Sequence, residues 1–277
     1  MKVLKSIFNF YLNSSIHVAL AVYAMTWITL VQFDLPYSKN VLYFIFFASI
    51  SGYNFVKYFG LAKFHHRSLA NWLKIIQVFS AIAFLLMGYY FFQLNSNVWI
   101  LIVVLGLITF LYAIPLIPKK YLFDDQQNLR EVGGAKVYII ALVWSLVTVL
   151  IPVLNTYVEI SADVFITVLQ RFCFVIVLML PFEIRDLKYD SLKLATIPQK
   201  IGTKKTKIIG LLLLLVFLFL EFLKVKNDYS SIISTLIITL LTLMLLVLSS
   251  EKQSKYYSAF LVEAIPIVWL LILLLFS

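Results

Sequence analysis

Residues 163–190 read DVFITVLQRFCFVIVLMLPFEIRDLKYD, an apolar run that ends in three carboxylates. A run of about 20 mostly apolar residues is long enough to cross a hydrocarbon core as a helix. At helical spacing Glu183, Asp186 and Asp190 fall on one stripe, at positions i, i+3 and i+7. Carboxylates at the end of a membrane helix usually line a cavity or hold a cation, since exposing them to lipid is costly. The stretch therefore predicts a membrane helix with a candidate site at its end.

The same apolar pattern recurs along the whole chain. Hydrophobic residues make up 62% of the 277 residues and charged residues 13%, with a mean hydropathy of +0.98. A soluble chain of this length could not bury so much apolar surface. We find nine runs of spanning length, which predict one all-α, polytopic membrane domain over residues 1–277. The predicted transmembrane helices are 14–33, 40–60, 72–93, 97–117, 135–154, 163–182, 207–224, 230–249 and 256–276.

The charge distribution predicts the orientation of these helices. The net charge is +10, but most of the Lys and Arg residues fall on alternate connections. The opposite side keeps only Lys39, Arg171, Lys224 and Lys226. This asymmetry follows the positive-inside rule and predicts a cytoplasmic N-terminus and a C-terminus on the other side. We therefore expect an integral protein of the bacterial inner (cell) membrane, in contact with membrane lipids and with no nucleic-acid partner.

The segment Pro181-Phe-Glu-Ile-Arg-Asp-Leu-Lys-Tyr-Asp190, followed by Thr196-Ile-Pro-Gln-Lys-Ile-Gly202, resembles the second aspartate-rich motif of UbiA-family prenyltransferases. In that family D-x-x-x-D ends the sixth helix, and a loop with Thr and a closing Gly follows. Asp186 and Asp190 supply the two aspartates here. Nine membrane helices with long inner loops also resemble that family. The resemblance implies helices arranged around a central cavity that opens to the cytoplasmic face.

This resemblance implies that the protein transfers a prenyl group from an isoprenoid diphosphate to a lipophilic acceptor held in the membrane. An allylic diphosphate ionises only if the departing negative charge is held, and Mg²⁺ does this by bridging carboxylates to phosphates. Asp186 and Asp190 would hold Mg²⁺, and Glu183 would extend the cluster by one turn. Arg185 would contact phosphate or lie among the lipid headgroups. Alternatively, the carboxylates only neutralise a very basic loop.

The first aspartate-rich motif of the family is degenerate in this chain. It normally reads N-D-x-x-D-x-x-x-D, and the matching stretch is residues 54–62, NFVKYFGLA. Asn54 remains as a possible Mg²⁺ ligand, whereas the aspartate positions hold Phe55, Tyr58 and Ala62, which are not Mg²⁺ ligands. Basic residues follow instead, so diphosphate could be bound directly by Lys57, Lys63 or Arg67. The same cations could equally serve only to fix the topology.

Several other side chains are candidates by type and position. Lys119 and Lys120, at the inner end of the fourth predicted helix, are phosphate contacts by resemblance or snorkelling lysines. Aromatic side chains beside the motifs could shield a prenyl cation, namely Tyr53, Tyr58 and Phe182.

Carboxylates within the last predicted helices also stand out. Glu263 lies about two turns inside an apolar run, where it is either functional or bonded to another helix. Glu221 and Lys224 stand three residues apart, as expected for a structural pair.

Two further interpretations of the chain remain open. One is a catalytically silent UbiA-like protein that binds an isoprenoid lipid or a partner enzyme, because the first motif is degenerate. The other is a small-solute transporter. It is disfavoured because Gly and Pro pairs do not interrupt the predicted helices near their middles, as they often do in transporters.

Overall fold

The computed structural model describes residues 2–64, 71–114, 134–156, 159–188, 195–226 and 228–277, and these form helices and connections without a strand. In chain order the elements are α1 (Lys2–Asn13), α2 (Ile16–Gln32), α3 (Lys39–Phe64), α4 (Asn71–Phe91), η1 (Ser96–Val98), α5 (Trp99–Ala113), α6 (Ala135–Asn155), α7 (Ala162–Asp186), α8 (Ile197–Phe222), α9 (Tyr229–Leu248), η5 (Tyr257–Val262) and α10 (Ile265–Phe276). The all-α prediction is confirmed.

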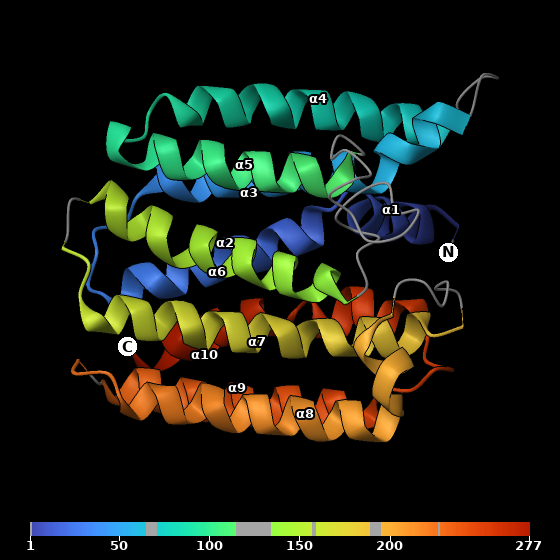
Figure 1. Cartoon of the computed structure of the whole chain (residues 1–277). Helices are drawn as coiled ribbons and strands as arrows, with labels where there is room; N and C mark the ends of the chain where they lie inside the picture. Colours follow the sequence, from blue (N-terminus) through green and yellow to red (C-terminus); the bar gives the residue numbers. More distant parts are fainter. Residues whose placement is uncertain (1, 65–70, 115–133, 157–158, 189–194, 227) are drawn as a thin grey trace, which may run out of the picture.

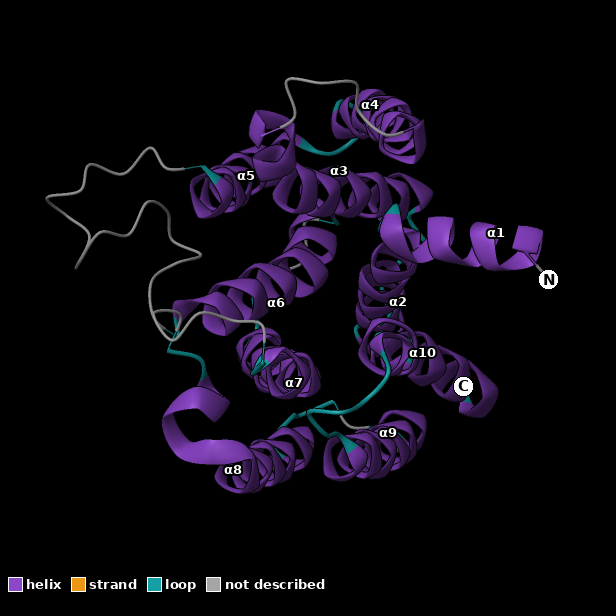
Figure 2. Ribbon diagram, turned by 90° about the vertical axis from the view of Figure 1, so that its right-hand side faces the viewer, coloured by secondary structure: helices purple, strands orange, loops and turns teal. Residues whose placement is uncertain are grey.

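The long helices lie side by side, and α1 turns away from them (Figure 1). Viewed along the helices, α2, α3, α5, α6, α7, α9 and α10 form a ring, because each packs against the next and α10 packs back on α2 (Figure 2). Helix α4 packs on α3, and α8 packs on α7 and α9. Helix α7 (Ala162–Asp186), which carries Glu183 and Asp186 of the acidic stripe, therefore has neighbours on several sides.

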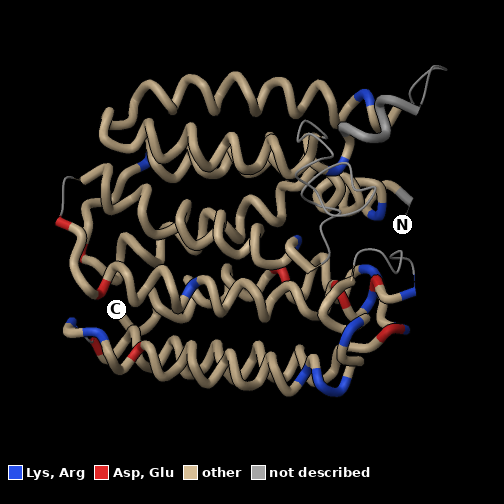
Figure 3. The backbone as a smooth tube through the Cα atoms, in the orientation of Figure 1, with Lys and Arg blue, Asp and Glu red and all other residues tan. Residues whose placement is uncertain are grey.

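Charged residues gather at the two ends of this bundle (Figure 3). We call the end where α3 and α7 finish, at Phe64 and Asp186, the motif end, and the N-terminal helix lies there. We call the end where α2 and α6 finish, at Gln32 and Asn155, the far end, and the C-terminus lies there. The first predicted motif, on α3, and the second, on α7, thus lie at the same end of the bundle.

The apolar helices make the chain an integral membrane protein. Among the described residues, six helices are long and apolar enough to cross a membrane, or seven if α1 and α2, bent by 53° relative to each other, count as one span. The six are α4, the η1–α5 segment, α6, α7, α9 and the η5–α10 segment. Helices α3 and α8 fall outside this set, and α8 carries Lys204, Lys205, Lys207 and Glu221. Nine spans therefore stay a prediction.

A cluster of three aromatic side chains joins α7, α8 and α10. Phe174 of α7 stacks on Phe217 of α8 at 4.9 Å between ring centroids, and both rings meet Trp269 of α10 edge-on. All three side chains are fully buried. Aromatic pairs in such geometries contribute about 0.5–1.5 kcal/mol beyond their buried area. This contact fixes α7, the helix that carries the second motif.

Helix α8 begins ten residues before its apolar run does, at Ile197 instead of residue 207. Its start is set by local chemistry: the backbone N–H of Thr196 donates to Gln199 Oε1 at 2.9 Å, and Pro198 lies in the first turn. Gly202 then breaks the helix with φ 79° and ψ 159°. That conformation is almost restricted to glycine, so Gly202 lets the first turn of α8 bend back towards α7.

We therefore expect Gly202→Ala to destabilise the protein by about 1–3 kcal/mol, because alanine is strained at this positive φ. The measurement is thermal unfolding of the purified protein in detergent. The matched control is Gly88→Ala, at a helical glycine in α4 where an added Cβ meets nothing within 4 Å. The control should be neutral or slightly stabilising. Equal losses in both variants would contradict the argument.

Candidate functional site

Asn54 of α3 is buried and joins three helices at the motif end. Its Oδ1 accepts a hydrogen bond from Ser15 Oγ at 2.8 Å. Its Nδ2 donates to the Ser14 carbonyl at 3.0 Å and to Ser80 Oγ of α4 at 2.8 Å. These contacts lie where the chain breaks between α1 and α2, and Ser15 there has a left-handed φ of 64°. The amide predicted as a possible metal ligand thus holds the helix break together.

The next turn of α3 presents a lysine and a tyrosine. Lys57 Nζ donates to Ser15 Oγ at 2.9 Å and lies 5.9 Å from the centre of the Tyr53 ring. The Tyr58 hydroxyl donates to the Asn13 carbonyl at 2.7 Å, which ties α3 to the end of α1. Lys57 is exposed. Both Lys57 and Tyr58 were predicted to bind substrate, and of the two only Lys57 carries a positive charge.

The last turn of α7 holds the predicted acidic stripe. Glu183 is buried, and its Oε2 accepts the backbone N–H of Ile197 at 3.2 Å, at the start of α8. Arg185 pairs with its neighbour Asp186 through two contacts, Nε to Oδ1 at 2.7 Å and Nη2 to Oδ2 at 3.0 Å. The guanidinium also lies 5.3 Å from the centre of the Phe182 ring. Glu183 therefore positions α8, whereas Asp186 is half-buried and held by a cation.

Glu263 brings a further carboxylate towards the two motif helices. It follows the π-helical turn η5, where its backbone N–H donates to the Ser258 carbonyl at 3.2 Å. The η5 turn packs against α7, the helix that carries the acidic stripe. Such π-helical turns within α-helices are frequent at functional sites. Both interpretations of Glu263 from the sequence, a functional carboxylate and a hydrogen bond to another helix, stay predictions.

His17 is a buried residue without a motif around it in the sequence. Its Nδ1 lies 2.6 Å from the Tyr11 hydroxyl, and its Nε2 lies 2.9 Å from the Phe260 carbonyl. The ring also stacks on Phe260 at 5.0 Å between centroids. His17 thereby joins α1, α2 and η5 beside Glu263. A single histidine at the start of an apolar run gives no sequence signal for such a role.

Several predicted site residues cannot be placed. Asp190, Arg67, Lys119 and Lys120 lie outside the described residues. Within the part of the chain that the structure covers, no group of three or more His, Cys, Asp or Glu side chains is arranged to hold a metal ion. The metal-binding roles of Asp186, Asp190, Glu183 and Asn54 therefore stay predictions.

Two solved structures share this fold. A UbiA homolog from Aeropyrum pernix K1 superposes with a TM-score of 0.66 at 13% identity, over 94% of this chain and 98% of that chain. A structure of digeranylgeranylglyceryl phosphate synthase superposes with a TM-score of 0.57 at 19% identity, over 100% and 99% of the two chains. No family model and no curated protein matches the sequence. The predicted UbiA-like fold is confirmed, and it extends over nearly the whole chain.

The hydrogen bonds of Asn54 lead to a stability prediction. Asn54→Ala should destabilise the protein by about 1–3 kcal/mol, because the Ser14 carbonyl and the Ser15 and Ser80 hydroxyls each lose a partner. The matched control in the same helix is Ser51→Ala, since Ser51 Oγ is a buried hydroxyl without a hydrogen-bond partner among the residues described. Thermal unfolding checks both variants. If Asn54→Ala unfolds at the wild-type temperature, the structural role assigned to Asn54 is wrong.

Proposed function

We propose that this protein transfers a prenyl group from an isoprenoid diphosphate to a lipophilic acceptor in the membrane, with the motif end at the cytoplasmic face. The observation that carries the proposal is the fold shared with a UbiA homolog along nearly the full length of both chains. The positions of Asn54 and Lys57 on α3 and of Arg185 and Asp186 on α7, at the same end of the bundle, support it.

The side chains present fit one Mg²⁺ ion on α7 better than a metal site divided between α3 and α7. Mg²⁺ is commonly bound by one or two carboxylates together with substrate phosphates. Asp186 supplies one carboxylate, and we propose Asp190 as the second. On the α3 side, Asn54 Oδ1 accepts from Ser15, and Phe55 and Tyr58 stand where the family motif has aspartates. When bound, Mg²⁺ would neutralise the negative charge of the departing diphosphate.

The α3 side would instead bind diphosphate through cations. Lys57 is exposed and lies beside Tyr53, and Arg185 stands on the opposite helix. An arginine that leaves a carboxylate for a phosphate keeps a two-point contact of the same geometry. We therefore propose that Arg185 exchanges Asp186 for diphosphate when substrate binds. Arg67, Lys119 and Lys120 are proposed as further phosphate contacts.

The reaction needs an electron pair to leave with the diphosphate as the allylic carbon–oxygen bond breaks. The cations hold that charge, and the aromatic faces of Tyr53 and Phe182 would shield the carbon cation. Tyr53 is fixed for this role, because its hydroxyl accepts a hydrogen bond from Trp144 Nε1 at 2.8 Å. The acceptor nucleophile then forms the new bond to carbon. Its displaced proton needs a base, and we propose Glu263, which follows the η5 turn packed against α7.

The second candidate function is binding without turnover, and one observation favours it. Both carboxylate oxygens of Asp186 are engaged by Arg185, and α3 lacks the aspartates of the first motif. A protein with these features could bind an isoprenoid lipid or a partner enzyme and release no diphosphate. The two functions are distinguished by incubating purified protein with geranyl, farnesyl or geranylgeranyl diphosphate, Mg²⁺ and a membrane lipid extract. Release of inorganic diphosphate supports transfer, whereas binding without release supports the silent alternative.

Asp186→Asn tests the metal-binding role. We expect Mg²⁺ to strengthen diphosphate binding in the wild type and this enhancement to fall at least about tenfold in the variant, since a loss of about 1.4 kcal/mol corresponds to a factor of ten. Binding is measured by calorimetry with and without Mg²⁺. The control is Asp34→Asn at the far end, where φ is 56° and asparagine is tolerated. Unchanged Mg²⁺ enhancement in Asp186→Asn would remove Asp186 from the metal site.

Lys57→Gln tests the cationic side of the site. We expect about a tenfold loss of diphosphate affinity that persists when Mg²⁺ is left out, because the contact is made by the protein itself. Lys39→Gln, at the exposed opposite end of the same helix, is the matched control and should bind as the wild type does. Equal affinities of Lys57→Gln and Lys39→Gln would show that Lys57 does not contact the diphosphate.

A further inference from the structure

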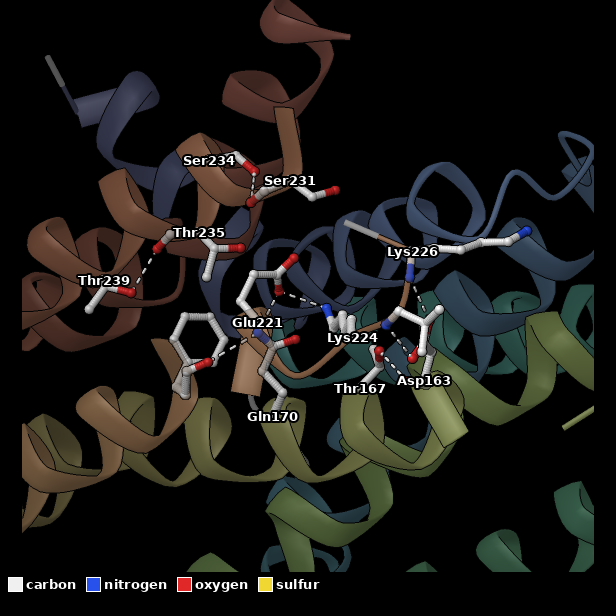
Figure 4. A network of polar contacts seen from close by, with 12 residues as sticks. Asp163, Thr167, Gln170, Glu221, Lys224, Lys226, Ser231, Ser234, Thr235 and Thr239 are labelled. Carbon is white, nitrogen blue, oxygen red and sulfur yellow. Dashed lines mark hydrogen bonds and ion pairs between the residues drawn. The ribbon is translucent and has the colours of Figure 1, made fainter. Parts of the chain in front are cut away.

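The far end of the bundle contains a second polar cluster, formed by Asp163 and Gln170 of α7, Glu221 of α8 and Lys224 beyond it (Figure 4). Glu221 Oε2 accepts hydrogen bonds from Gln170 Nε2 and from Lys224 Nζ, each at 2.7 Å. The exposed fractions of the paired Lys224 and Glu221 side chains are only 6% and 1%. This is a buried ion pair, well away from the motif end.

Asp163 fixes the connection between α8 and α9 above this pair. Its Oδ1 accepts the backbone N–H of Val225 at 2.9 Å, and its Oδ2 accepts that of Lys226 at 3.1 Å. The Lys224 ammonium is held by Glu221 Oε2, and both side chains are buried. Each charge in the cluster therefore has a direct partner or a neighbour of opposite sign.

The cluster still contains polar atoms that lack a partner among the described residues. They are Glu221 Oε1, Gln170 Oε1 and both amide atoms of Gln32, the last residue of α2. Each of these atoms is shielded from the surface. A buried polar group without a hydrogen bond costs about 1–3 kcal/mol, and more at membrane depth. The unpartnered amide of Gln32 needs both an acceptor for its N–H groups and a donor for its oxygen.

A small cavity lies between these groups. It is lined by Gln32, Asp163, Thr167, Glu221, Lys224 and Ser231, together with Phe33 and Lys226, and offers about 10 Å³ to the centre of a water molecule. That volume is at the lower limit for one water molecule, which needs roughly 10–15 Å³ by the same measure. Organic ligands and phosphates are too large for it. Only a water molecule or a small ion fits.

We propose that this cavity is a binding site for one resident water molecule that bridges Gln32 of α2 to Glu221 of α8. The water accepts from Gln32 Nε2 and donates to Glu221 Oε1. A water molecule fits better than a metal cation for two reasons. The lining carries two acids, Asp163 and Glu221, and two lysines, Lys224 and Lys226, so it has no net charge to neutralise. A cation also cannot accept from the Gln32 amide N–H.

The bridge gives the fold a contact that direct hydrogen bonds do not provide. Gln32 ends α2, and Glu221 stands near the end of α8, so the water joins α2 to α8 at the far end. Water-mediated contacts are nearly as favourable in enthalpy as direct ones. The bridge consists of Gln32, the water and Glu221. It lies at the far end and does not involve the proposed diphosphate site.

A crystal structure of the full chain, in buffer with sodium or with thallium(I) in its place, tests the site directly. We expect one density peak within hydrogen-bond distance of both Gln32 and Glu221, without anomalous signal from thallium. An anomalous peak there would identify a monovalent cation site and overturn the proposal. The absence of a peak between the two side chains would overturn it as well.

A double-mutant cycle of Gln32→Leu and Glu221→Gln gives a second measurement in solution. Each single variant should lower the unfolding temperature by about 2–6 °C, and the double variant by at least about 2 °C less than the sum, because both remove the same bridge. The control cycle pairs Glu221→Gln with Gln253→Leu, whose amide donates to the Pro181 carbonyl at 2.7 Å at the motif end. The control cycle should be additive, and an additive Gln32–Glu221 cycle would refute the bridge.

Discussion

The structure depends on one constraint: inside an apolar bundle, polar groups must find their partners within the protein. Lipid offers no hydrogen bonds, so each break in a helix requires a side chain to complete it. Asn54 serves the break between α1 and α2, and Glu183 serves the start of α8. Asp163 serves the connection between α8 and α9. Three of the scarce polar side chains are thus used to hold the ends of helices in place.

This constraint changes how the acidic stripe is interpreted. Three carboxylates on one helical stripe suggest one shared ion, but their environments differ. Glu183 is buried and holds a backbone N–H, whereas the Arg185 and Asp186 side chains are 23% and 22% exposed. The Arg185–Asp186 pair is bidentate, so it is held by more than a single surface contact. A phosphate would offer Arg185 the same two-point geometry, which is why the exchange proposed above requires no change in the shape of the contact.

The sequence predicted α2 to α10, because the length and composition of apolar runs determine membrane helices directly, but it did not predict α1 (Lys2–Asn13), which precedes the first predicted run. It predicted the end of α7 within four residues, at 182 instead of Asp186, but missed the early start of α8. The apolar pattern gives no sign of that start, because it depends on the capping contact between Thr196 and Gln199 and on Pro198. The contacts of Asn54 were also beyond prediction, because they join residues about 40 positions apart in the sequence. Only the packing of α3 beside α2 and α4 brings those groups together.

The two structural neighbours show that this fold does not depend on particular side chains. At 13% identity the superposition still covers 94% of this chain, so the arrangement of helices tolerates almost complete replacement of the side chains. Apolar packing accepts many residues of similar volume. A diphosphate, in contrast, needs positive charge at a particular place, whether from a metal ion or from a side chain. On α3 the residues between Asn54 and Gly60 include Lys57 but no carboxylate, so in the proposed function Lys57 would provide that charge and the metal ligands would come from α7.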